Sequence, residues 1–146
     1  MIPEGPPLFS YTHTLRSRYS ETDQMGYVYY GRYLEYFEVA RTEMIRSLGL
    51  PYAKMEQQGI MLPVVESHVQ YKAPVFYDAL MSVSVLIFDV PTARLTTFYQ
   101  LHTHDGKQLH ALGKVELCFM NAKSRKPRRA PADFVDRLKN NAKGQS

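Results

Sequence analysis

Apolar and polar residues alternate near the start of the chain and then change to a helical period. Between residues 9 and 16, aromatic and apolar side chains alternate with polar ones, which predicts a β-strand. From Tyr29 to Leu48, apolar residues recur every three or four positions, which predicts a long amphipathic helix. Gly49 is suited to end this helix, and Pro51 is suited to open a shorter one that stops near Gly59.

The rest of the chain predicts an antiparallel run of four strands and a closing helix. We expect the strands at about 61–72, 80–89, 94–104 and 108–120, and the helix at 132–141. Asp105 and Gly106 separate the last two strands and are a strong hairpin signal. One long helix with about five strands packs economically when the sheet curls around the helix. This α+β architecture is the hotdog fold.

In that architecture one face of the sheet covers the helix and the other face is left open, so we expect a dimer with a continuous sheet. The 146 residues predict one domain, 1–146, with a Pro- and Gly-rich, flexible N-terminus over 1–7. No apolar run reaches the roughly 20 residues that span a bilayer, and the N-terminus lacks the features of a signal peptide. The single cysteine, Cys118, fits a reducing cytoplasm.

The net charge of +4 is concentrated in one segment, residues 121–131, which holds five cations and no acid. A nucleic-acid-binding domain more often spreads its cations along a face and interleaves them with aromatics. The sequence therefore leaves two interpretations of this segment: a solvated loop, or a docking site for a small anion such as a phosphate. Cys, His and acidic residues show no metal-ligand spacing, and we expect no metal or cofactor.

Asp23 lies in the loop between the first strand and the long helix, and it is the leading candidate for chemistry. An Asp in this place often only satisfies a turn. However, it lies too far before Tyr29 to be a simple helix cap, and the loop that follows is largely aromatic. A loop carboxylate next to a helix N-terminus can supply a base or nucleophile, while the unpaired N–H groups of the helix hold a developing oxyanion.

A longer motif around Asp23 resembles a known family. It reads Tyr19-x-x-Thr22-Asp23-x-x-Gly26-x-Val28-Tyr29-Tyr30-x-x-Tyr33-Leu34-x-Tyr36-Phe37-Glu38-x-Ala40-Arg41-Thr42-Glu43, followed later by Tyr71-x-x-Pro74-x-x-x-Asp78. It resembles the hotdog acyl-CoA thioesterases, most closely the 4-hydroxybenzoyl-CoA thioesterase-like branch, which includes the acyl-CoA thioester hydrolases encoded near Tol–Pal genes. The likeness covers roughly residues 11–138.

The resemblance implies that the Asp23 carboxylate attacks the thioester carbonyl or activates water. It also implies that the backbone N–H groups of Tyr30 and Gly31 polarise the thioester oxygen. Many relatives carry His at the position of Tyr30, and a phenol does not supply imidazole chemistry at neutral pH. Any acid–base role for that position is therefore in doubt here, while the backbone role is unaffected.

Further residues receive roles from the same resemblance. An aromatic acyl pocket is expected from Tyr27, Tyr29 and Tyr33. The strand residues Glu66, Ser67 and His68 are expected to reach the pocket of a partner subunit. The phosphates of coenzyme A are expected to bind cations around the basic segment, namely Arg94, Lys123, Arg125 and Arg128. The sequence also places Glu38 and Arg41 three residues apart on the helix, a spacing that favours an ion pair over a substrate contact. Arg41 falls beside the apolar stripe, so its burial at the subunit interface is the alternative.

The sequence thus predicts an acyl-CoA thioesterase that acts as a dimer-based homo-oligomer, a tetramer by family analogy, without nucleic acid and without a membrane span. An acyl-carrier protein is a further candidate partner. Three alternatives stay open: a hotdog hydratase or dehydratase that uses a His spatially close to Asp23, an acyl-CoA or acyl-carrier-protein binding module without turnover, and, third, a nucleic-acid module. The acyl group itself, aromatic or aliphatic, is not specified by the sequence.

Overall fold

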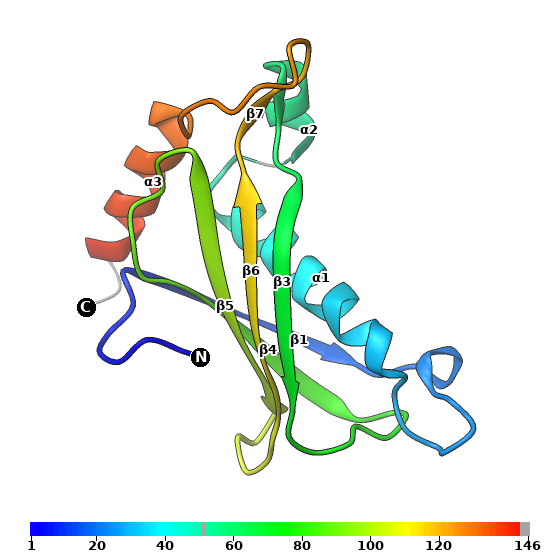
Figure 1. The fold of residues 1–146 in the computed structure, drawn as a ribbon. Helices are drawn as coiled ribbons and strands as arrows, with labels where there is room; N and C mark the ends of the chain where they lie inside the picture. Colours follow the sequence, from blue (N-terminus) through cyan, green and yellow to red (C-terminus); the bar gives the residue numbers. More distant parts are fainter. Residues whose placement is uncertain (51, 144–146) are drawn as a thin grey trace.

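Five antiparallel strands wrap around one long helix in the computed structural model, which describes residues 1–50 and 52–143 (Figure 1). The strand order is β1-β4-β5-β6-β3. These strands are β1 (Phe9–Arg16), β3 (Val64–Tyr71), β4 (Leu80–Ile87), β5 (Arg94–Thr103) and β6 (Leu109–Cys118). The arrangement confirms the α+β hotdog fold that the alternation of helical and strand periods predicts.

The helices also follow the predicted pattern. They are the 3₁₀ turns η1 (Tyr19–Glu21) and η2 (Tyr30–Arg32), and the helices α1 (Tyr33–Ser47), α2 (Tyr52–Gln57) and α3 (Ala132–Lys143). The predicted long helix thus begins with a 3₁₀ turn. Gly49 follows its end with φ 81°, a backbone conformation that glycine adopts without strain. The predicted role of Pro51 lies outside the described residues, and no described helix has the length and apolarity needed to span a membrane.

The sequence does not specify which strands are neighbours in the sheet. β3 does not pair with β4; it crosses to the far side of the sheet and pairs with β6, with Ser67 opposite Val115. The predicted strand 61–72 is also divided, because the chain leaves the ladder around Pro63, which has no N–H to donate. Its first part, β2 (Ile60–Met61), pairs instead with β7 (Met120–Asn121) in a separate two-stranded sheet.

The core lies between α1 and the concave face of the sheet. The ring of Phe37 on α1 stacks on Tyr99 of β5, with centroids 4.5 Å apart and planes 15° apart. The guanidinium of Arg41 is buried here and donates to the hydroxyls of Tyr99 (2.9 Å) and Tyr52 (3.3 Å). The predicted ion pair between Arg41 and Glu38 is wrong, because Arg41 turns into the core whereas Glu38 stays exposed.

The close approach of α1 to the sheet depends on Gly113 of β6, because a Cβ atom at this position would overlap the ring of Phe37. We predict that Gly113→Val lowers the free energy of unfolding by about 2–3 kcal/mol, since overpacking a core typically costs about 1–3 kcal/mol. Urea unfolding measures this cost. The same substitution in a Phe37→Leu background should cost less, and equal costs in the two backgrounds would contradict the packing explanation.

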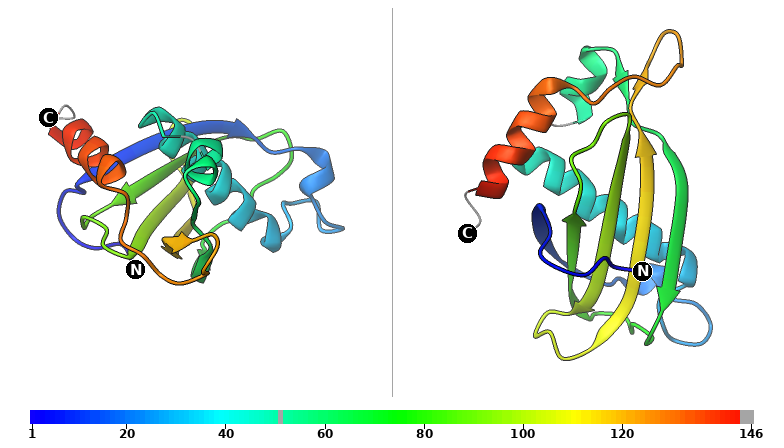
Figure 2. Two further views of the ribbon diagram at one scale, coloured as in Figure 1. Left: turned by 90° about the horizontal axis from the view of Figure 1, so that it is seen from above. Right: turned by 60° about the vertical axis from the view of Figure 1, so that its left-hand side comes forward.

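β3 is an edge strand, and it separates the two regions to which the sequence assigns function. Its outer edge has no partner strand in the part of the chain that the structure describes, and Val64 and Val65 are about half exposed. The loop of residues 22–29 lies at the Tyr71 end of β3, and the basic segment 121–131 lies beyond the Val64 end (Figures 1 and 2). At about 3.3 Å per residue, β3 alone spans roughly 23 Å.

Candidate active site

The loop that carries Asp23 is a short hairpin between β1 and α1. Thr22 and Val28 form an isolated antiparallel bridge, and the N–H of Asp23 donates to the carbonyl of Tyr27 at 2.9 Å. The chain reverses between them through Gly26, whose φ of 86° lies in the left-handed region that favours glycine. The N–H of Val28 then donates to Val75 at 2.7 Å, which fixes the hairpin against the segment after β3.

The Asp23 carboxylate has one oxygen engaged and one available. Oδ1 accepts the N–H of Met25 at 2.8 Å, the turn contact that is ordinary for an Asp in this position. Oδ2 has no hydrogen-bond partner among the residues that the structure describes. The side chain is half-buried. The turn contact therefore orients the carboxylate and leaves an oxygen for a ligand or a water molecule.

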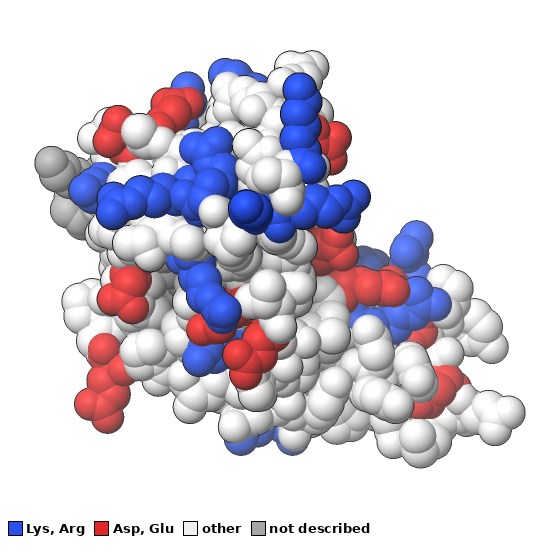
Figure 3. All heavy atoms as spheres, turned by 45° about the horizontal axis from the view of Figure 1, so that its top comes forward, with Lys and Arg blue, Asp and Glu red and all other residues white. Residues whose placement is uncertain are grey.

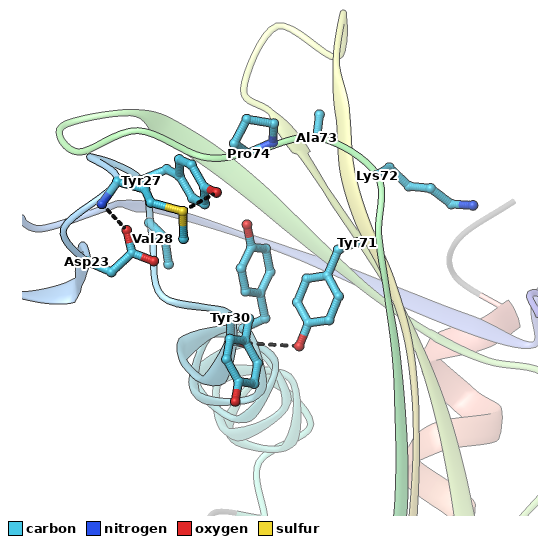
Figure 4. A pocket seen from close by; sticks show the side chains of 10 residues that line it. Asp23, Tyr27, Val28, Tyr30, Tyr71, Lys72, Ala73 and Pro74 are labelled. Atoms are coloured by element: carbon cyan, nitrogen blue, oxygen red, sulfur yellow. Dashed lines mark hydrogen bonds between the residues drawn. The ribbon is translucent and has the colours of Figure 1, made fainter.

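A cavity of about 400 Å³ opens beside Asp23. The hairpin forms one wall, the start of the helix forms the floor, and the end of β3 with the following segment forms the opposite wall (Figure 4). The lining residues are Asp23, Met25, Tyr27, Val28, Tyr30, Tyr33, Tyr71, Lys72, Ala73 and Pro74. Asp23 is the only acidic member of this lining. The cavity thus places one carboxylate beside four phenol rings.

Aromatic contacts fix the wall opposite Asp23. The phenol of Tyr71 donates to the carbonyl of Tyr30 at 3.0 Å, as the dashed line in Figure 4 marks. Its ring lies edge-on to Tyr30 and Tyr33, with centroids 6.3 and 5.0 Å away. Burial raises the pKa of Tyr33 and of Tyr71, so both phenols are neutral at physiological pH.

Two backbone donors stand at the start of the helix. The first hydrogen bond of η2 runs from the N–H of Arg32 to the carbonyl of Tyr29, at 2.9 Å. The N–H groups of Tyr30 and Gly31 precede that bond, and neither has a hydrogen-bond partner in the described part of the chain. Tyr30 lines the same cavity as Asp23, whereas Gly31 is not among the lining residues. A helix start of this kind can donate to an oxyanion.

Four predicted pocket residues lie outside this cavity in the described protomer. Tyr29 packs against Tyr30 with ring centroids 4.6 Å apart, and the neighbouring Tyr30 phenol raises the pKa of the Tyr29 phenol. Glu66, Ser67 and His68 lie along β3, away from Asp23. Glu66 bonds His68 at 2.8 Å, and this contact lowers the pKa of the Glu66 carboxyl. These three side chains reach a catalytic pocket only if it belongs to another subunit.

The predicted phosphate-binding cations lie together at the other end of the sheet. Arg94 begins β5 and donates to Glu116 at 3.1 Å, while Lys123, Arg125 and Arg128 belong to the basic segment. None of the five cations in that segment forms a salt bridge with another described residue. Figure 3 shows Lys and Arg side chains gathered in a band across this end of the molecule. The cations of the basic segment are thus available to an anionic ligand, whereas Arg94 is paired with Glu116.

Two features of the site were not predicted. Tyr71 and Pro74 belong to the motif, but their place in the cavity depends on the crossover of β3, which no local pattern reveals. Glu21, two residues before Asp23, is a buried carboxylate, although acidic side chains are usually exposed. Position 21 is one of the unspecified positions of the motif, and no sequence pattern predicts the burial of its side chain.

The chain that carries this site is similar to a known protein family. Residues 17–138 match the sequence profile of the Thioesterase-like superfamily. The chain belongs to this superfamily. The match includes both the Asp23 hairpin and the basic segment of the thioesterase-like chain, so one family profile covers the two ends of the sheet described above.

The names of individual relatives agree with the assignment to this superfamily. Putative acyl-CoA thioesterase YneP of Bacillus subtilis (strain 168) is 39% identical over 90 residues, which is 62% of this chain and 65% of that protein, just under two thirds of its length. Acyl-CoA thioester hydrolase YbgC of Escherichia coli O157:H7 is 26% identical over 86% of this chain and 92% of that protein. The crystal structure of a DHNA-CoA thioesterase from Staphylococcus aureus superposes with a TM-score of 0.84 and 32% identity, covering 94% of this chain and 96% of that one.

Proposed function

We propose that this protein is an acyl-CoA thioesterase, which hydrolyses an acyl- or aryl-CoA thioester to the free acid and coenzyme A. The observation that carries the proposal is the Asp23 carboxylate, held in a cavity of about 400 Å³ that also contains the first residue of η2. Membership of the Thioesterase-like superfamily and the thioester hydrolase names of the relatives support the same reaction.

The proposed reaction needs few groups. Asp23 takes a proton from a water molecule that attacks the thioester carbonyl, or attacks that carbon itself; in the second route, water attacks the acyl carbon of the resulting mixed anhydride after coenzyme A has left and releases the free acid. Negative charge develops on the carbonyl oxygen, where the N–H groups of Tyr30 and Gly31 stabilise it; such donors have contributed about 3–4 kcal/mol in other enzymes. The C–S bond then breaks and coenzyme A departs as a thiolate, a good leaving group. No side chain has to act as a strong general acid, and no cofactor is required.

The position of the cations supports a proposed site that two subunits share. In one protomer, Arg94 and the basic segment lie at the opposite end of β3 from Asp23 (Figure 1). If two β3 edges pair antiparallel about a two-fold axis, the Val64 end of one subunit lies beside the Tyr71 end of its partner. The partner's basic segment then lies near the Asp23 cavity, and the partner's β3 residues Glu66, Ser67 and His68 approach it.

Several observations bear on the branch, compartment, oligomeric state and acyl group of the proposed enzyme. The similarity to YbgC is compatible with the Tol–Pal-associated branch. The buried free thiol of Cys118 is compatible with a reducing cytoplasm. The edge of β3, which has no partner strand among the described residues, supports a dimer, and a tetramer rests on family analogy. A largely aromatic cavity favours an aryl or short acyl group over a long chain.

Thiol release from a panel of acyl-CoAs tests the function. We predict that the purified protein releases thiol from aromatic or short-chain thioesters, and that kcat/KM falls at least about tenfold for long chains, because a chain that leaves the cavity loses buried contact area. Binding of every acyl-CoA without thiol release would contradict the proposed hydrolysis and favour a binding module.

A further inference from the structure

Glu21 is a buried carboxylate at the base of the Asp23 hairpin. Its side chain is 7% exposed, and burial of a carboxylate is unfavourable unless hydrogen bonds replace its water. Oε1 accepts the N–H of Arg18 at 2.7 Å and the hydroxyl of Tyr36 at 3.0 Å. The Arg18 guanidinium lies 3.4 Å from Oε2, but it is largely exposed to solvent. The two hydrogen bonds to Oε1 are shorter than the contact of Oε2 with Arg18, and one of them comes from Tyr36 on α1.

The backbone of the same residue holds the other end of the hairpin. The carbonyl of Glu21 accepts the N–H of Tyr29 at 2.9 Å. Tyr29 immediately precedes Tyr30, the first of the two backbone donors, while Asp23 follows Glu21 by two residues. A single residue thus connects the strand side of the hairpin, the helix side of the hairpin and the body of α1.

The Tyr36 phenol keeps the proton that it donates to Glu21 over the working pH range. Its side chain is buried on α1, and burial together with the hydrogen bond to Glu21 raises the pKa of its phenol. The phenol therefore remains a donor. Neither Glu21 nor Tyr36 is among the described residues that line the Asp23 cavity, so neither has a place to contact the acyl group.

We infer that Glu21 is a positioning residue for hydrolysis: its link to Tyr36 and Tyr29 fixes the distance between the Asp23 carboxylate and the N–H donors of Tyr30 and Gly31. The inference rests on the proposed thioesterase function. Misplacement of reacting groups by about 1 Å can cost on the order of 100-fold in rate. Loss of the link should therefore reduce kcat, while KM, which depends on the cavity and the distant cations, changes little.

A matched pair of substitutions tests the role of Tyr36. Tyr36→Phe removes one buried hydroxyl that binds Glu21, and Tyr99→Phe removes one buried hydroxyl that binds Arg41, away from the hairpin. Both variants should unfold at lower temperature. Only Tyr36→Phe should lower kcat, by about tenfold or more with KM within about threefold. Hydrogen exchange at the Tyr29 amide should also increase only in Tyr36→Phe. Equal kcat in the two variants would overturn the inference.

Two substitutions at Glu21 separate positioning from charge. Glu21→Gln keeps an oxygen at the Oε1 position, where both short contacts are made, and should retain kcat within about threefold. Glu21→Met is similar in size but has no such acceptor, and should lose about 100-fold in kcat. A Gln variant as inactive as the Met variant would show that the charge itself is needed, and a fully active Met variant would show that the link is not needed. Either result overturns the inference.

The outcomes distinguish this inference from the proposed function. A wild type that releases no thiol from any acyl-CoA overturns both. An active wild type with an inactive Asp23→Asn variant supports the function, and the Tyr36→Phe and Tyr99→Phe comparison then decides the role of Glu21. If Glu21→Met does not fold, the same phenylalanine pair decides, because each of those variants loses only one oxygen atom.

Discussion

Asp23→Asn is expected to lower kcat for acyl-CoA hydrolysis by about 10³-fold, within the roughly 10²–10⁴-fold range of a positioned acid–base group. The amide keeps the shape of the carboxylate, and its oxygen still accepts the N–H of Met25, so the hairpin should keep its conformation. The amide neither takes a proton from water nor attacks a carbonyl. Steady-state thiol release, with acyl-CoA binding measured by calorimetry on the same sample, separates lost chemistry from lost binding.

Asp105 supplies a matched control for this substitution. It also lies in a hairpin loop, and its Oδ1 accepts the N–H of the residue two positions on, Lys107, at 2.9 Å. That contact lowers the pKa of the Asp105 carboxyl. Asp105→Asn therefore makes the same chemical change in the same kind of turn, away from the cavity, and should leave kcat unchanged. Equal loss of activity in the two variants would indicate a general effect on folding.

Complementation between two inactive chains should show that the site is shared between subunits. A chain with Lys123, Arg125 and Arg128 changed to Ala should lose at least about 100-fold in kcat/KM, because charge-assisted contacts to phosphates contribute about 1.5–3 kcal/mol each where they are fully formed. Combined with Asp23→Asn chains in one dimer, it should regain about half of the wild-type kcat/KM. One of the two sites then joins an intact Asp23 to the partner's intact cations.

In the control dimer, one chain carries Asp23→Asn together with the three Ala substitutions, and the other chain is wild type. Co-expression with a different affinity tag on each chain, followed by two purification steps, isolates mixed dimers for both combinations. If each protomer uses its own cations, the dimer of Asp23→Asn with the triple Ala variant has no complete site. Absence of recovered activity in that dimer would contradict the shared site and the antiparallel pairing of β3.

The fold was predictable because local patterns and global packing agree. The strand alternation before Asp23, the helical stripe after it and the turn at Gly106 each correspond to an observed element. The crossover of β3 was not predictable from such patterns. A strand that pairs with β6 has the same alternation as one that pairs with β4, because period 2 reports which face is buried and not which neighbour lies beside it.

The candidate site was predictable in part for the same reason. Asp23 and Tyr30 stand close in one motif, and the hairpin brings both to one cavity. Tyr71 joins them only through the crossover, and the link from Glu21 to Tyr36 spans 15 residues between a loop and a helix. Arg94 and Asp23 lie at opposite ends of the sheet, so their separation depends on how all the strands are assembled. Contacts within the motif could therefore be inferred, and contacts between elements could not.

The central claim is that water cleaves an acyl-CoA thioester at Asp23, and a single-turnover reaction in ¹⁸O-labelled water tests it most directly. Wild type in excess over an acyl-CoA that it binds should give free coenzyme A and a carboxylic acid that carries one oxygen from the solvent. Asp23→Asn should leave the thioester intact under the same conditions. Intact thioester with the wild type, or equal amounts of labelled acid with both proteins, would contradict the account.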